Sequence, residues 1–315
     1  MCYLGPVGVV YGYDESSGRK VTVDTADGSA TQFQAYRGHL RAVAYRMLGS
    51  LSEADDAVQE TWLRLNRSGA EVENLRAWLT TVVSRVCLDM LRARVARHEE
   101  PLDAHVPDPV VTAAGDDPEE QALLADSVGL ALLVVLDTLS PAERLAFVLH
   151  DIFAVPFERI GPILDRSPAA AKQLASRARR RLSEVGSAEA ETDPARQREV
   201  LGAFLAASRD GDFAGLLAVL DPDVVLRADA GSGPFGPSRL LRGAQEVAAQ
   251  AMSYAPMARF AQPVLVNGAP GHLIARDGRP LVVIGVTTRN GKITEIDILA
   301  DPDRLSGLGL DDLIG

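Results

Sequence analysis

The sequence is poor in cysteine and in aromatic residues, and it has no long apolar run. Its two cysteines, Cys2 and Cys87, have the spacing neither of a disulfide framework nor of a metal site. No segment approaches the roughly 20 apolar residues that a membrane-spanning helix needs. The first ten residues are apolar but lack the basic start of a signal peptide. We therefore expect a cytoplasmic protein that enters no membrane and needs no metal or cofactor.

Basic charge is also scarce in the chain as a whole. The 315 residues include 32 Lys and Arg against 43 Asp and Glu, which gives a net charge of −11. This balance argues against a free-standing, nonspecific nucleic-acid binder, since such proteins are usually basic. The basic residues gather instead in clusters at 92–97 and 172–181, with acidic stretches between them. The pattern indicates a protein that meets DNA only at particular places, with help from a partner.

The second basic cluster lies on a predicted helix over 168–182. Ser167 suits the N-cap, and Pro168 suits the first helical position. One apolar stripe runs along this helix, formed by Ala171, Leu174, Ala175, Ala178 and Leu182. A short apolar helix over 157–164 and a tight turn come before it, and together they predict a helix-turn-helix. Pro162 predicts that the first of these helices is kinked or shortened.

Five parts of the chain are expected from changes in composition and pattern. They are a disordered tail over 1–30, a helical domain over 31–97, a linker over 98–118, a second helical domain over 119–186 and a C-terminal α+β domain over 195–315. The linker is rich in proline and acid and has no Lys or Arg, so a plain solvated segment is the favoured interpretation. The alternative is an acidic strand that occupies a basic channel meant for nucleic acid.

The first helical domain is expected to contain helices over 33–48, 53–65 and 75–97, with Ser52 capping the second. The second helix carries four acids beside its apolar face. Trp62 and Leu63 add apolar surface beyond that face and are expected to be exposed. An acidic helix with exposed apolar residues suits a basic protein partner.

The C-terminal domain begins with two predicted helices and continues as strands. Strands are expected at 224–228, 263–266, 272–276, 281–288 and 292–300, with one further helix over 243–253. Asn290-Gly291 between the last two strands is a strong hairpin signal. The order of elements predicts helices that cover one face of a curved sheet.

Several motifs in the helical domains resemble a family of bacterial transcription proteins. The stretches 55–64, 76–79 and 89–92 look like region two of extracytoplasmic-function (ECF) sigma factors, and 139–147 and 171–179 look like region four. The C-terminal domain resembles the SnoaL-like extension of one group of these proteins, which has the ketosteroid-isomerase-like cone fold. Its family motifs fall at 229–233 and 301–305 here, namely at Asp229, Gly231, Gly233, Asp301, Pro302, Asp303, Arg304 and Leu305.

The resemblance implies that the protein binds core RNA polymerase and directs it to promoter DNA. Polymerase contacts are expected, on the largest-subunit clamp, from Asp55, Asp56, Gln59, Glu60, Trp62 and Leu63. The flap region of polymerase is a further expected partner. DNA contacts are expected from Asn74, Ser84, Arg85, Arg92, Arg94, Lys172, Gln173, Ser176, Arg177, Arg179 and Arg180. The C-terminal domain is expected to regulate the protein in cis, with no separate anti-sigma factor required.

Two other hypotheses belong to different classes of protein. A ligand-responsive repressor would use the helix-turn-helix alone, but it leaves the acidic helix 53–65 unexplained. A ketosteroid-isomerase-like enzyme would need a base such as Asp229, Asp297 or His272 in its cone. Because nothing in the spacing separates the pKa values of these groups, we do not predict an enzyme.

Overall fold

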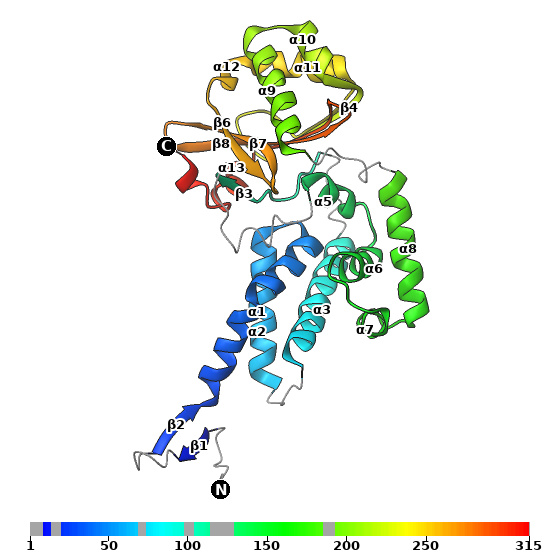
Figure 1. The fold of residues 1–315 in the computed structure, drawn as a ribbon, viewed down its shortest axis with the longest axis vertical. Helices are drawn as coiled ribbons and strands as arrows, with labels where there is room; N and C mark the ends of the chain where they lie inside the picture. The colour runs from blue at the N-terminus through cyan, green and yellow to red at the C-terminus, as the bar shows by residue number, and fades with distance from the viewer. Residues whose placement is uncertain are drawn as a thin grey trace.

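The computed structural model describes residues 9–13, 20–68, 74–97, 104–113, 129–184 and 193–314, with side chains from residue 30 onward. Two helical bundles lie side by side, and the C-terminal sheet domain is stacked on one end of them (Figure 1). A continuous apolar core joins the bundles to one face of that sheet. In the described part of the chain, no helix is both long and apolar enough to cross a membrane.

The N-terminal segment contains two strands, so the expectation of a disordered tail over 1–30 is wrong for part of it. Strands β1 (Val9–Tyr13) and β2 (Lys20–Asp24) pair antiparallel, and helix α1 begins directly after β2. Both strands are rich in valine, tyrosine and threonine, which favour extended backbone. Residues 1–8 and 14–19 lie outside the described parts of the chain.

The first bundle consists of α1 (Thr25–Leu48), α2 (Leu51–Ser68) and α3 (Leu75–Ala96). Its core includes Leu40 and Val43 of α1 and Leu79 and Val83 of α3, all fully buried. Helix α1 begins before the predicted position 33, and α2 begins at Leu51. Ser52 therefore lies in the first turn of α2 and does not precede it as the expected cap.

The second bundle contains the predicted helix-turn-helix. Its elements are α5 (Leu130–Asp137), α6 (Pro141–Phe147), the π-helix η1 (Val148–Ile152), α7 (Phe157–Ile163) and α8 (Pro168–Glu184). Pro162 lies in the last turn of α7, which ends there as expected. A Cβ on Gly161 would lie 2.8 Å from the carbonyl oxygen of Arg166, so the tight turn needs glycine at this position. The predicted helical pattern over 119–128 falls outside the described residues.

The C-terminal domain has the predicted α+β class. Its helical elements are α9 (Pro194–Asp210), α10 (Phe213–Val219), α11 (Ala244–Ser253), α12 (Ala255–Ala258), α13 (Pro302–Ser306) and η3 (Asp311–Leu313). Its strands are β4 (Leu220–Asp229), β5 (Arg239–Arg242), β6 (Ala261–Val266), β7 (Ala269–Arg276), β8 (Arg279–Arg289) and β9 (Lys292–Leu299). Asn290 and Gly291 both take positive φ in the turn between β8 and β9.

The sheet has the order β3-β6-β7-β8-β9-β4-β5, with β4 parallel to β9 and the other pairs antiparallel. Its edge strand β3 (Val111–Ala113) belongs to the predicted linker and pairs with β6, Val111 facing Val266. The hypothesis of a plain solvated linker is therefore wrong for 104–113. Ala104, Val106 and Val110 are buried there, because two domains cover the segment from opposite sides.

Candidate functional site

The two motifs of the C-terminal domain lie against each other and hold the linker. Asp301 caps helix α13 by accepting hydrogen bonds from the backbone N–H groups of Asp303 (2.9 Å) and Arg304 (3.3 Å). Pro302 occupies the first turn of this short helix, and Leu305 is buried beneath it. The cap and the buried leucine fix the direction in which the Arg304 side chain leaves the helix.

Arg304 is the centre of an ion-pair cluster that we call the clamp, formed by Arg304, Asp229 and Asp108. Its Nε donates to Asp108 Oδ1 at 2.9 Å, and its Nη1 donates to Asp229 Oδ2 at 2.7 Å. Its Nη2 donates to the carbonyl oxygen of Val106 at 2.6 Å. One guanidinium therefore joins helix α13, strand β4 and the linker, using the planar fork of donors that arginine provides.

Asp229 is buried at the end of β4 and is held ionised by its neighbours. Its Oδ2 also faces Nδ1 of His105 at 3.2 Å and accepts from the N–H of Val106 at 3.3 Å. Burial alone raises the pKa of Asp229, but the hydrogen bond from His105 and the charge of Arg304 outweigh it and hold the pKa below its usual value. The clamp is thus a charged contact at ordinary pH.

The glycines of the first motif let the two loops approach closely. Gly231 has φ +50°, and a Cβ there would lie 2.1 Å from Asp301 Oδ2. A Cβ on Gly233 would lie 2.9 Å from the carbonyl oxygen of Ala230 and 3.0 Å from that of Ala300. Residues 229–233 and 301–305, both singled out in the sequence, therefore form one site.

The linker is bound on its other side by the first bundle. The N–H of Leu51 donates to Asp108 Oδ2 at 2.9 Å, and the N–H of Asp108 donates to the carbonyl oxygen of Gly49 at 2.8 Å. The Tyr45 hydroxyl donates to the carbonyl oxygen of Asp108 at 2.6 Å and accepts from Asn267 Nδ2 at 3.0 Å. Asp108 therefore connects the first bundle to the C-terminal domain.

Sequence reasoning missed Asp108, Tyr45 and Asn267. The signal that could have pointed to the linker is local: Val106, Val110 and Val111 interrupt its acidic and proline-rich composition. Nothing in the pattern around Tyr45 or Asn267 distinguishes them from ordinary core and turn residues.

Helix α8 has the predicted division between a buried stripe and a basic outer face. Ala171, Ala175, Ala178 and Leu182 are buried. The exposed residues on the outer face are Lys172, Gln173, Ser176, Arg177, Arg179 and Arg180. Arg179 is paired with Asp151 (2.6 Å), and the neighbouring Arg181 is paired with Glu143 (3.2 Å). The other cations of this face make no ion pair within the described parts.

The DNA-contact candidates of α3 are divided between exposed and internal positions. Asn74 caps the helix, accepting from the N–H of Ala77 at 3.0 Å, and Arg92 is exposed. Ser84 is fully buried and donates to the carbonyl oxygen of Thr80, so its predicted DNA contact is wrong in this conformation. Arg94 forms an ion pair with Glu53 of α2 and keeps 23% of its side chain exposed, so its charge is already matched within the protein, and its DNA contact stays a prediction.

Arg85, the remaining candidate on α3, contacts the second bundle. Its guanidinium donates to the carbonyl oxygen of Pro162 in α7 at 3.3 Å. The bundles also meet through Arg144 of α6, which donates to the carbonyl oxygen of Arg46 in α1 (3.2 Å) and is paired with Asp137. In this arrangement, therefore, part of the candidate DNA face of α3 lies against the helix-turn-helix.

The acidic face of α2 is accessible, with one correction. Asp56 and Gln59 are exposed, and Leu63 keeps 39% of its surface exposed. Trp62 was expected to be exposed, but it is partly buried because its ring packs against Phe33 at 5.0 Å between centroids. Three of the four acids of α2 already have intramolecular partners: Glu53 pairs with Arg94, Asp55 pairs with Arg41 at 2.8 Å, and Glu60 pairs with Arg64 at 2.8 Å.

The three groups considered as a catalytic base do not meet in a cavity. Asp297 is buried and pairs with Arg227 (3.1 Å), while its neighbours Ile296 and Ile298 line an apolar cavity on the opposite face of the sheet. Burial raises the pKa of Asp297 to about 6, although Arg227 opposes the rise. Burial and, to a smaller extent, the charge of Arg209 together lower the pKa of His272 to about 4. The residues that line the cavity include no carboxylate and no histidine.

Comparison with known proteins connects these sites to a family. Residues 32–97 match the model of Sigma-70 region 2, and residues 129–182 match that of Sigma-70, region 4. The chain is 38% identical to the ECF RNA polymerase sigma factor SigJ of Mycobacterium tuberculosis, over 88% of this chain and 93% of that protein. The chain belongs to the ECF sigma factors.

Two further matches agree with this assignment. The probable ECF sigma factor SigI of Mycobacterium tuberculosis is 36% identical over 90% of this chain and 96% of that one. The crystal structure of SigJ superposes with a TM-score of 0.72 and covers 89% of this chain and 99% of that chain. The sigma factor therefore directs transcription initiation and carries a SnoaL-like C-terminal domain. A repressor built on the helix-turn-helix alone is not favoured, because region 2 is also present.

Proposed function

We propose that the C-terminal domain regulates this sigma factor in cis by holding the linker and the two bundles in a closed arrangement. The observation that carries the proposal is the clamp, in which Arg304 binds Asp108 of the linker through two of its nitrogens. The same Asp108 accepts a hydrogen bond from the backbone of α2, the helix assigned to polymerase binding. The C-terminal domain thus reaches the polymerase-binding helix through the linker.

The acidic face of α2 is the proposed docking surface for the polymerase clamp and comprises Asp55, Asp56, Gln59, Glu60, Trp62 and Leu63. Charges on this face would steer binding to a basic partner surface, and Leu63 would supply an apolar contact at its centre. The exposed positions of Asp56, Gln59 and Leu63 support this assignment. Partly buried Trp62 would support the surface from beneath.

The basic face of α8 is the proposed reader of the upstream promoter element. Lys172, Gln173, Ser176 and Arg177 lie in its N-terminal half, the part of a recognition helix that contacts base edges. Arg180 lies further along and suits a phosphate, and Arg179 would do so once its ion pair with Asp151 opens. For the element near the start site we retain Asn74, Arg85, Arg92 and Arg94, and we leave out Ser84 because it is buried.

The closed arrangement should be inhibitory, because it uses groups that DNA binding needs. Arg85 donates one hydrogen bond to the carbonyl oxygen of Pro162, which holds its guanidinium beside α7 while the bundles stay together. Opening the clamp would free the linker and let the bundles separate. No separate anti-sigma factor is required in this scheme, since the inhibitory contacts all lie within the chain.

The cone serves regulation and not catalysis in this proposal. Its cavity is lined without a carboxylate or histidine, and Asp229 is occupied by the clamp. The protein would act in the cytoplasm, together with the polymerase and the promoter.

The test is promoter-specific transcription in vitro with core polymerase and the full-length chain. Arg304→Gln should raise initiation about threefold to tenfold, because the loss of a charged clamp contact is worth about 1 kcal/mol or more. Arg276→Gln is the matched control, since Arg276 is exposed, pairs with the exposed Asp277, lies over the ring of Phe260 and takes no part in the clamp. Equal initiation by the wild type and both variants would refute inhibition by the clamp.

Chains cut after Ser187 and after Ala300 extend the test to whole segments. The second cut removes α13 with Arg304 and leaves the sheet in place. If both cut chains initiate transcription at the level of the full-length protein, regulation in cis is wrong. Capture of core polymerase by each chain separates a defect in polymerase binding from one in promoter use.

A further inference from the structure

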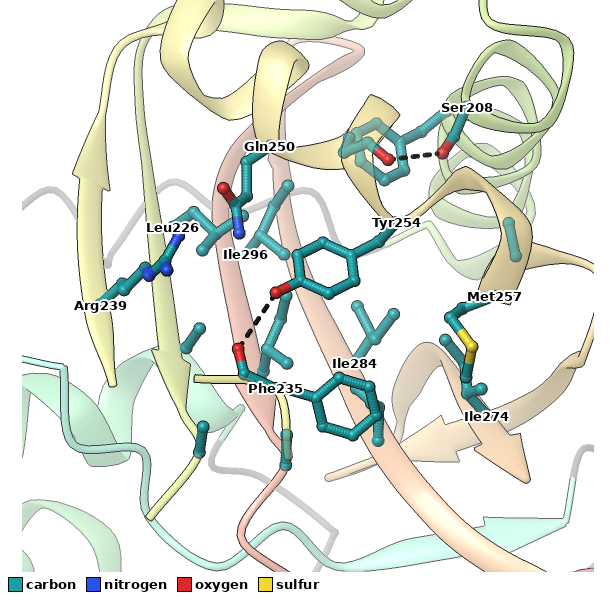
Figure 2. Close-up of a pocket in the computed structure, with 18 of the residues that line it drawn as sticks. Ser208, Leu226, Phe235, Arg239, Gln250, Tyr254, Met257, Ile274, Ile284 and Ile296 are labelled. Atoms are coloured by element: carbon teal, nitrogen blue, oxygen red, sulfur yellow. Dashed lines mark hydrogen bonds between the residues drawn. The ribbon is translucent and has the colours of Figure 1, made fainter. Parts of the chain in front are cut away.

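The C-terminal domain contains an apolar cavity between its helices and the inner face of its sheet. The cavity has a volume of about 120 Å³ and is walled by α9, α11, α12 and the strands β4, β7, β8 and β9. Its lining is mainly aliphatic and aromatic, with Leu226, Ile284, Ile296 and Phe235 among the larger side chains. Figure 2 shows these side chains converging on the cavity from helices and strands. An engineered apolar cavity of about 150 Å³ in another protein binds benzene, so this space can hold a small apolar body.

Few polar groups line the cavity, and two of them already have hydrogen-bond partners within the domain. The Ser208 hydroxyl donates to the carbonyl oxygen of Ala251 (3.3 Å), and the Tyr254 hydroxyl donates to that of Phe235 (3.2 Å). The guanidinium of Arg239 and the side-chain amide of Gln250 have no hydrogen-bond partner among the described residues. Figure 2 shows both at one end of the cavity, with Met257 and Ile274 at the other.

An unpaired cation beside an apolar space points to a particular kind of occupant. We propose that the cavity binds a small monocarboxylate whose apolar chain has about six to eight carbons, the outermost of which lie in the Arg239 end of the cavity. The body would fill the aliphatic space, and the carboxylate would lie at the Arg239 end, where it would accept hydrogen bonds from the guanidinium and the Gln250 amide. Because Arg239 is exposed, the carboxylate stays in contact with water and is not forced into the apolar interior.

The cavity lies on the reverse side of the strands that carry the clamp. Ala228 and Ala230 line it, and Asp229 between them points to the opposite face, toward Arg304. Ala300 also lines it and directly precedes Asp301, and its N–H donates to the carbonyl oxygen of Asp229 at 2.7 Å. An occupant that displaces these alanines would shift both loops of the clamp. The ligand then acts as the signal that opens the clamp. This coupling rests on the proposed function, in which the clamp holds the protein closed.

Binding is tested by titration calorimetry of the full-length protein with octanoate and with octan-1-ol as its uncharged counterpart. Octanoate should bind with a Kd of about 10 µM to 1 mM, given the small apolar area available. Arg239→Gln should weaken octanoate about threefold to tenfold and leave octan-1-ol unchanged. Arg242→Gln is the matched control, because Arg242 lies on the same strand β5 but does not line the cavity.

Three outcomes would overturn the site: no octanoate binding, equal octanoate binding by wild type and Arg239→Gln, or an equal loss in Arg242→Gln. Hydrogen exchange of amides 104–113, with and without saturating octanoate, tests the coupling. Faster exchange in its presence supports the coupling, and unchanged exchange refutes it. Failure of the proposed function is recognised separately, because it would leave octanoate binding intact while Arg304→Gln fails to change transcription.

Discussion

Arg304 and Asp108 are 196 residues apart in the chain and are joined by two hydrogen bonds, from Nε at 2.9 Å and from Nη2 at 2.5 Å. The side chains keep only 23% and 10% of their surface exposed. Solvent therefore screens this pair less than an ordinary surface ion pair, and the contact can stabilise the docked linker appreciably.

A double-mutant cycle on this pair should show strong coupling. We expect Arg304→Gln and Asp108→Asn each to speed hydrogen exchange of the amides over 104–111. The double variant should lose less protection from exchange than the sum of the losses in the two single variants. The coupling free energy should be about 1–3 kcal/mol for a charged, partly buried pair. Strictly additive effects would mean that the two side chains are neighbours without a functional contact.

Gly231→Ala should destabilise the contact between the two motif loops. The new Cβ would lie 2.1 Å from Asp301 Oδ2, so the Asp301 side chain would have to leave its position as the cap of α13. Gly211→Ala is a matched control, because Gly211 also has positive φ (+67°) but a Cβ there meets nothing within 4 Å. The midpoint of thermal unfolding, followed by circular dichroism, should fall at least about 3 °C further for Gly231→Ala. Equal shifts in the two variants would show that only backbone strain matters.

The C-terminal strands and the helix-turn-helix could be predicted because their signals are local. The Asn290-Gly291 turn and the cap at Ser167 each depend on a few neighbouring residues, and the structure confirms both. The linker could not be predicted in this way. Its average composition indicates a solvated segment, but Val106 and Val110 are buried because the first bundle and the cone close over them.

The candidate sites show the same division between local and distant information. The exposed face of α8 follows from helical periodicity alone. The burial of Ser84 and the pairing of Arg94 with Glu53 depend on where α2 and α3 pack, and the spacing of these residues in the sequence does not contain that information. The two tail motifs could be identified by resemblance, while their shared partner Asp108 could be found only from the fold.

The pH dependence of stability should differ in sign between two buried groups of the cone. Burial raises the pKa of Asp297 to about 6, so between about pH 4 and 6 the native state holds a proton that the unfolded chain has released. The contribution of Asp297 to the free energy of unfolding therefore falls as pH rises through this range, by on the order of 2 kcal/mol. His272, with its pKa lowered to about 4, contributes in the opposite direction between about pH 4 and 6.5.

Urea unfolding of Asp297→Asn and His272→Gln over this pH range measures both contributions. The stability of the wild type minus that of Asp297→Asn should decrease with pH, and the difference for His272→Gln should increase. Using differences is necessary because His39, whose pKa burial also lowers to about 4, adds a slope common to all three proteins. Parallel curves for the wild type and Asp297→Asn would show that Asp297 keeps an ordinary pKa.

Free and paired cations on α8 should contribute differently to the salt dependence of promoter binding. Arg180 is exposed and makes no ion pair within the described residues, whereas the adjacent Arg181 is paired with Glu143 at 3.2 Å. A phosphate contact by Arg180 releases a counterion, so Arg180→Ala should reduce the salt slope of promoter binding by about 1. Arg181→Ala should change that slope less, because its charge is already partly neutralised by Glu143. The two variants are compared by fluorescence anisotropy of holoenzyme binding to promoter DNA. The salt concentration runs from about 50 to 200 mM, where counterion release changes the affinity strongly. A larger slope change for Arg181→Ala would show that Arg181, and not Arg180, contacts the phosphate.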